Sequence, residues 1–157
     1  MAGRAGRQKG WEGMGYVTDL WEMGRAPYRN GLYRADDSVR AIEVDGPDLS
    51  VFRLGPLEDF DLPGVKERRE TTTLMFNPGC CLELPGRSGF VCGGEGSLGA
   101  DGFFARLAAD RSLVWVASME NANPFERVEI EGWTARFFNN LGNSVVVDFR
   151  DPAFDVR

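Results

Sequence analysis

Residues 125–149, FERVEIEGWTARFFNNLGNSVVVDF, decide the fold, because apolar and polar side chains alternate along most of this segment. An alternation with a period of two is typical of antiparallel strands that bury one face and leave the other in water. The alternation is interrupted at Glu131-Gly132 and at residues 139–143, and both interruptions are rich in residues that turns favour. The segment therefore predicts three successive antiparallel strands joined by two hairpin turns.

The same alternation predicts how the three strands pair. A two-residue turn at Glu131-Gly132 sets the register of the first hairpin, and a five-residue loop at 139–143 sets that of the second. The predicted pairs are Ile130–Trp133 and Val128–Ala135, followed by Phe137–Val145, Ala135–Val147 and Trp133–Phe149. All of these apolar side chains, including Trp133, then face one core.

The rest of the chain extends this β-rich pattern. The 157 residues are 43% hydrophobic and 27% charged, which is typical of one globular domain. Strand patterns occur at 39–44, 49–54, 70–76, 80–84, 89–92, 103–107 and 113–117, the last being apolar throughout and therefore central. Asp19 is placed to cap one short helix. We predict a mainly β fold, an antiparallel hairpin or meander sheet that is strongly curved or two-layered, with at most one or two short helices.

Two segments stand out by their glycine content. Residues 1–15 are basic and glycine-rich, and we expect a flexible segment there that precedes a single β-rich domain at 16–157. Residues 93–102, GGEGSLGADG, invite comparison with a phosphate-binding loop. No Gly-Lys-Ser/Thr sequence and no helical pattern follow them, so we expect a mobile or tightly turning connector.

The chain has no histidine, which removes the commonest general base and the commonest metal ligand. A Ser-His-Asp or Cys-His site is therefore impossible within this chain. Its three cysteines, Cys80, Cys81 and Cys92, are an odd number, which fits a reducing compartment, and we expect buried free thiols. We expect no catalytic residue, no cofactor and no metal site.

The net charge of −6 disfavours nucleic-acid binding, which depends on lysine and arginine. An acidic surface can instead steer and complement a basic protein, although solvated loop residues would give the same pattern. The acidic residues that we expect to contact a partner are Asp36, Asp37, Asp45, Asp48, Glu58, Asp59 and Asp61.

Three further residues complete the predicted partner-binding set. Trp21, like Trp11, lies in a poorly patterned region, so it either anchors the N-terminal part to the domain or contacts a partner. Glu120 and Asn121 belong to a polar connector between two strands, a position where functional loops are common.

No stretch of about 18 apolar residues is present, and no apolar run follows the basic N-terminal residues. We therefore expect neither a membrane span nor a secretory signal, and we expect a cytoplasmic protein. Its oligomeric state is open.

The last third of the chain resembles a known class of proteins. LVWV at 113–116, NPF at 123–125, VEIEG at 128–132 and FNNLG at 138–142 followed by Val147-Asp148 are similar to small bacterial immunity proteins of polymorphic toxin systems. The resemblance implies a non-enzymatic cytoplasmic protein that occludes a toxin domain, and many such domains are basic nucleases. No individual contact residue follows from it.

These observations together predict a protein-binding domain, with immunity-type inhibition of a basic toxin as the expected function. Two alternatives remain. A small-ligand or carbohydrate-binding β-domain would have a concave pocket lined by exposed aromatic rings. A carboxylate-dependent enzyme would bring two acids together in an apolar cavity.

Overall fold

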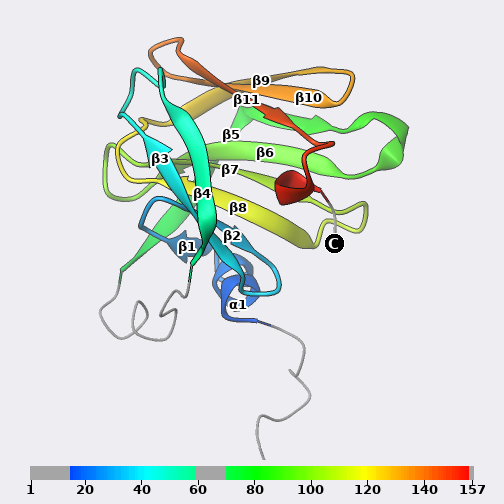
Figure 1. Ribbon diagram of the computed structural model, residues 1–157, viewed down its shortest axis with the longest axis horizontal. Helices are drawn as coiled ribbons and strands as arrows, with labels where there is room; N and C mark the ends of the chain where they lie inside the picture. The colour runs from blue at the N-terminus through cyan, green and yellow to red at the C-terminus, as the bar shows by residue number, and fades with distance from the viewer. Residues whose placement is uncertain (1–14, 59–69, 156–157) are drawn as a thin grey trace, which may run out of the picture.

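The computed structural model describes residues 15–58 and 70–155, and these form two antiparallel sheets and one α-helix (Figure 1). The mainly β fold predicted from the sequence is confirmed. The elements are α1 (Tyr16–Glu22), β1 (Arg25–Pro27), β2 (Gly31–Arg34), β3 (Val39–Val44), β4 (Phe52–Glu58), β5 (Thr71–Glu83), β6 (Phe90–Gly96), β7 (Gly102–Leu107), β8 (Leu113–Met119), β9 (Phe125–Glu131), β10 (Thr134–Asn139) and β11 (Ser144–Asp148), with 3₁₀ turns η1 (Pro85–Arg87) and η2 (Pro152–Phe154).

The larger sheet has eight strands in the order β1-β5-β6-β7-β8-β2-β3-β4. Strand β8 lies inside it between β7 and β2, and every residue of this strand is buried, as its continuous apolar sequence predicts. The cysteine-containing segments at 80–84 and 89–92 pair as a hairpin, with Cys81 opposite Cys92. The segment at 70–76 is therefore the first half of one long strand, β5.

The two faces of the large sheet are covered by different elements (Figure 1). The three-stranded sheet of β9, β10 and β11 covers one face, where Phe104 of β7 packs with Phe137 of β10. Helix α1 covers the other face, where Val17 packs with Tyr33 and Phe103. Alternate residues of the central strands thus serve two separate cores.

The pairing of β9 with β10 corrects one prediction. Ile130 lies opposite Ala135 rather than Trp133, because the two-residue turn consists of Gly132 and Trp133. Gly132 adopts a φ of 58°, a left-handed conformation that suits the first position of such a turn. Trp133 is consequently 61% exposed, so its predicted place in the core is wrong.

The second hairpin has the predicted register. Phe137 pairs with Val145 and Ala135 with Val147 in the β10–β11 ladder. Beyond the ladder, the Phe149 amide donates a hydrogen bond to the Trp133 carbonyl at 2.8 Å. The side chains that are buried on the face toward the large sheet are those of Phe137, Val145, Ala135, Val147 and Phe149.

Half of the glycine-rich segment at 93–102 belongs to strands, and only the other half is the expected connector. Gly93, Gly94 and Gly96 belong to β6, and Gly102 opens β7, so the turn comprises residues 97–101. Asp101 stabilises this turn, because its buried carboxylate accepts hydrogen bonds from the Thr72 hydroxyl at 2.8 Å and the Leu98 amide at 3.2 Å.

Helix α1 begins three residues earlier than predicted, at Tyr16 rather than Asp19. Its N-cap residue is Gly15, which offers no side chain to the free amides of the first turn. Asp37, in the distant turn between β2 and β3, provides the missing acceptors. Its carboxylate accepts hydrogen bonds from the backbone amides of Tyr16 and Val17 at 3.0 and 2.9 Å. Asp37 is thus a long-range helix cap.

Replacing Asp37 with alanine is expected to lower the free energy of unfolding by about 1 kcal/mol, because two helix amides lose their acceptors. Urea denaturation followed by circular dichroism measures this loss. Asp37→Asn keeps one acceptor oxygen and should lose less than Asp37→Ala. Equal stability of Asp37→Ala and the unchanged protein would contradict the capping role.

Candidate functional site

The predicted acidic residues lie at two ends of the sheet rather than in one patch. Asp36 and Asp37 are in the β2–β3 turn, and Asp45 and Asp48 are in the β3–β4 turn, so the length of β3 separates the two pairs. Asp37 caps α1, and Asp36 accepts hydrogen bonds from the amide and hydroxyl of Ser38.

Glu58 is the last residue of β4, and its side chain is not described. Asp59 and Asp61 lie outside the described residues, as do Trp11 and nearly all of the basic segment predicted to be flexible.

Trp21 packs onto the domain. Its ring meets the edges of Phe76 and Phe103, with ring centres 5.5 and 6.3 Å apart. These contacts join the only described α-helix to β5 and β7, which is the anchoring arrangement considered for Trp21 from the sequence.

Three loops meet at the end of the sheets that carries Asp45 and Asp48. We call residues 45–51, 120–124 and 139–143 the amide-linked loops, because asparagine side chains join them. Asn139 is buried, and its side-chain amide donates to the carbonyls of Pro47 at 2.7 Å and Ala122 at 2.9 Å. Asn143 donates to the same Pro47 carbonyl at 3.0 Å. The sequence showed these asparagines as turn formers, and nothing in the local pattern revealed that they bridge three loops.

The outer surface of the amide-linked loops combines negative charge with one apolar side chain. Asp45, Asp48 and Asn121 are exposed there, and Leu141 is 58% exposed. Glu120 is half-buried and accepts a hydrogen bond from the Asn30 amide at 3.4 Å. The structure thus brings four of the predicted partner-binding residues to one end of the molecule.

Hydrogen bonds keep the charge of this surface in place. The Asp45 carboxylate accepts hydrogen bonds from the hydroxyl of Ser50 and the amide of Val51. These bonds lower the pKa of the Asp45 carboxyl below its ordinary value, because they favour the ionised form. The carboxylate is therefore ionised at neutral pH and its position is fixed by the turn.

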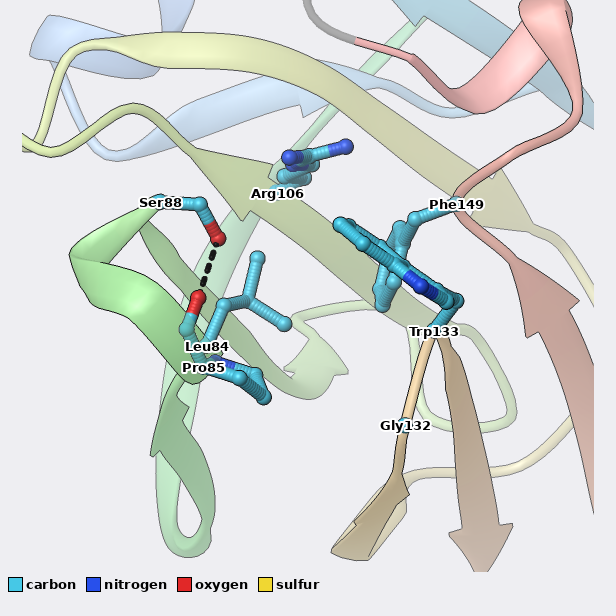
Figure 2. Close-up of a pocket in the computed structure, with 7 residues that line it drawn as sticks. All are labelled: Leu84, Pro85, Ser88, Arg106, Gly132, Trp133 and Phe149. Carbon is cyan, nitrogen blue, oxygen red and sulfur yellow. Dashed lines mark hydrogen bonds between the residues drawn. The ribbon is translucent and has the colours of Figure 1, made fainter.

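A cavity of about 240 Å³ opens at the opposite end, where the two sheets meet. We call it the slot (Figure 2). It is lined by Leu84, Pro85 and Ser88 of the β5–β6 turn, Arg106 of β7, Gly132 and Trp133 of the β9–β10 turn, and Phe149. Figure 2 shows Leu84 and Pro85 facing Trp133 across the opening. Sequence reasoning missed the slot, because it placed Trp133 in the core.

Arg106 gives the slot its charge. The residue is 5% exposed, and its Nη1 donates to the carbonyl of Phe154 at 3.0 Å. Its guanidinium carbon lies 4.9 Å from the centre of the Phe149 ring. The Nε atom is buried and has no hydrogen-bond partner among the described residues. Burial lowers the pKa of Arg106, but an arginine keeps its charge at any physiological pH.

The residues that line the slot offer little acid–base chemistry. None of the seven is acidic, so the slot does not have the pair of carboxylates that a carboxylate-dependent enzyme would need. Across residues 15–58 and 70–155, no group of three or more histidine, cysteine, aspartate or glutamate side chains is placed to hold a metal ion.

The three cysteines are free thiols. Cys80 and Cys92 are buried, as expected from the sequence, whereas Cys81 is exposed. Burial raises the pKa of Cys80 to about 12 and also raises that of Cys92, so neither buried thiol is ionised at neutral pH. Both serve as small apolar side chains in the two cores.

Comparison with known protein families, curated proteins and solved structures finds no match to this chain. No relative therefore supplies a function or a set of site residues. In the part of the chain that the structure describes, no helix is both long enough and apolar enough to cross a membrane.

Proposed function

We propose that this protein is a non-enzymatic binding domain that inhibits a toxin by covering it, as the immunity proteins that its C-terminal third resembles do. The observation that supports this proposal best is the set of amide-linked loops, which together expose Asp45, Asp48, Asn121 and the apolar side chain of Leu141. A central apolar side chain within a polar, charged rim is typical of protein interfaces.

The rigidity of these loops supports the proposal further. The buried Asn139 amide bonds two of the loops to the third, so little conformational freedom is left for a partner to remove. Acidic groups that are held in place complement a basic partner and speed its approach. Tight inhibition would need an interface of about 1,200 to 2,000 Å² in total, so the partner would extend beyond the loops onto the adjoining strands.

A second candidate function, binding of a small ligand, is favoured by the slot. Trp133 is an exposed aromatic ring at the mouth of a concave, mainly apolar cavity, which is the feature that distinguishes this alternative. The two functions use opposite ends of the molecule, so evidence for one does not exclude the other.

The inhibitory function is tested by co-expression with the protein encoded in the adjacent reading frame. We expect that protein to arrest growth when expressed alone and to be harmless when this chain is present. Affinity purification followed by size-exclusion chromatography with light scattering should then recover a complex of the two proteins.

The proposal fails if growth arrest by the neighbouring protein is unchanged by this chain and no complex is recovered. It also fails if the purified chain relieves toxicity by modifying the neighbouring protein catalytically, which substoichiometric amounts of the chain would reveal.

A further inference from the structure

We propose that the slot is a binding site for small aromatic carboxylates. This inference names the ligand class of the second candidate function and rests on it. It does not depend on inhibition through the amide-linked loops. Three observations carry it: a buried arginine with an unpaired donor, two apolar walls and the volume of the cavity.

The first observation concerns hydrogen bonding by Arg106. A guanidinium presents two parallel N–H groups on the edge that includes Nε, and a carboxylate accepts both of them at once. In Arg106 the protein uses Nη1, which donates to Phe154, and leaves Nε without an acceptor among the described residues. A buried charge with an unpaired donor is unfavourable, and a carboxylate in the slot would supply both the opposite charge and the missing acceptor.

The nearby groups do not replace that carboxylate. Trp115 donates its indole N–H to the same Phe154 carbonyl at 3.0 Å, so this acceptor is shared between two donors. Asp155 attracts the charge of Arg106 electrostatically, whereas Arg34 repels it. The described ion pairs Arg29–Glu70, Arg53–Glu43, Arg127–Glu129 and Arg150–Asp148 do not involve Arg106.

The second observation is the apolar surface that leads to Arg106. Leu84 and Pro85 form one wall, and the Trp133 ring lies across the opening (Figure 2). A flat aromatic ring between these walls would bury apolar area on both faces and stack on Trp133. The Phe149 ring already lies against the guanidinium of Arg106. The aromatic ring of the ligand would therefore lie near the mouth of the slot, with its carboxylate pointing inward to Arg106.

The third observation is size. A cavity of about 240 Å³ is smaller than the roughly 300 to 1,000 Å³ that sites for drug-sized ligands occupy. It suits one ring with a short acidic arm and excludes nucleotides and oligosaccharides. Phenylacetate therefore represents the ligand class, and benzyl alcohol has the same ring without the carboxylate.

The test is a titration of the isotope-labelled full-length protein with phenylacetate, followed by two-dimensional NMR of the indole N–H groups. The indole signal that disappears in Trp133→Phe belongs to Trp133. We expect this signal to shift and saturate with a Kd of about 1 mM or tighter. Benzyl alcohol should bind at least tenfold more weakly, because it does not use the charge of Arg106.

Two variants and one control locate the site. Trp133→Ala removes both the stacking ring and the indole reporter, so its titration is followed through the indole N–H of Trp115, which shares the Phe154 carbonyl with Arg106. This variant should weaken phenylacetate binding about three- to tenfold. Leu141→Ala, which truncates a similarly exposed apolar residue at the other end, is the matched control and should leave binding unchanged. Arg106→Lys keeps the charge, removes the fork and should weaken binding about tenfold or more. If Arg106→Lys does not fold, the Trp133 variant and the benzyl alcohol titration still decide.

The outcomes separate this inference from the function on which it rests. Equal binding of benzyl alcohol and phenylacetate overturns the carboxylate specificity but keeps the slot as a ligand site. A Trp133 signal that responds to neither compound overturns both. Phenylacetate binding that Trp133→Ala and Leu141→Ala weaken equally places the compound elsewhere and also overturns the inference.

Discussion

Replacing Phe104 with alanine is expected to lower the free energy of unfolding by about 3 to 5 kcal/mol. Phe104 is fully buried between the two sheets and stacks on Phe137, with ring centres 4.2 Å apart and an angle of 8° between the planes. Trp115 and Phe125 meet it edge to face at 6.0 and 5.2 Å. Truncation would leave a cavity that the three neighbouring rings cannot fill. The variant therefore loses the free energy of burying the Phe104 ring and also has the cost of the cavity.

Chemical denaturation measures this loss, and Phe76→Ala is the matched control. Phe76 is 48% exposed and packs on Trp21 and Phe103 at the surface of the other core. Its truncation should lose less than half of what Phe104→Ala loses. A similar decrease in the free energy of unfolding of both variants would mean that the aromatic cluster between the sheets contributes no more to stability than the surface contacts of Phe76.

Replacing Gly94 with alanine is expected to lower the free energy of unfolding by about 1 to 3 kcal/mol or more, the largest predicted loss after that of Phe104→Ala. A Cβ atom at this position would overlap the carbonyl oxygen of Met75 and lie 3.1 Å from the amide nitrogen of Asn77. Both atoms belong to the backbone of β5, which pairs with β6 here, so the clash cannot be relieved by a side-chain rotation.

The matched control for this change is Gly142→Asn. Gly142 has a positive φ of 84° and no atom within 4 Å of an added Cβ, and asparagine tolerates that conformation. Thermal unfolding of the two variants should show a large decrease in Tm for Gly94→Ala and a small one for Gly142→Asn. Equal decreases would contradict the close approach of β5 and β6 at Gly94.

The alternation of side chains predicted the strands and their buried faces, but it could not distinguish two registers of the β9–β10 hairpin. A slip of two residues leaves every side chain on its face, because strands have a period of two. The position of the turn decides between them, and Gly132 can occupy either place in a two-residue turn. Trp133 then either joins the core or stands in the turn, and the structure puts it in the turn.

The candidate sites depend on contacts between residues far apart in the sequence. Asn139 reaches Pro47 and Arg106 reaches Phe154, which are pairs separated by 92 and 48 residues. Local patterns report burial and turn propensity, and they do not report which distant carbonyl a side chain will meet. The acidic residues were visible as charges, yet the use of Asp37 as a helix cap required the fold.

The most direct test of the inhibitory function is the salt dependence of association between this chain and the neighbouring protein, measured by stopped-flow fluorescence. Asp45→Asn combined with Asp48→Asn removes two charges and keeps, at position 45, one side-chain oxygen that can accept the hydrogen bond from the Val51 amide. Glu129→Gln combined with Glu131→Gln is the control, because it removes two exposed charges from β9 of the three-stranded sheet, away from the amide-linked loops.

We expect the first double variant to associate about three- to tenfold more slowly at low salt and to show a weaker salt dependence. The control should match the unchanged protein. Identical association rates for all three proteins at every salt concentration would contradict recognition through the acidic amide-linked loops.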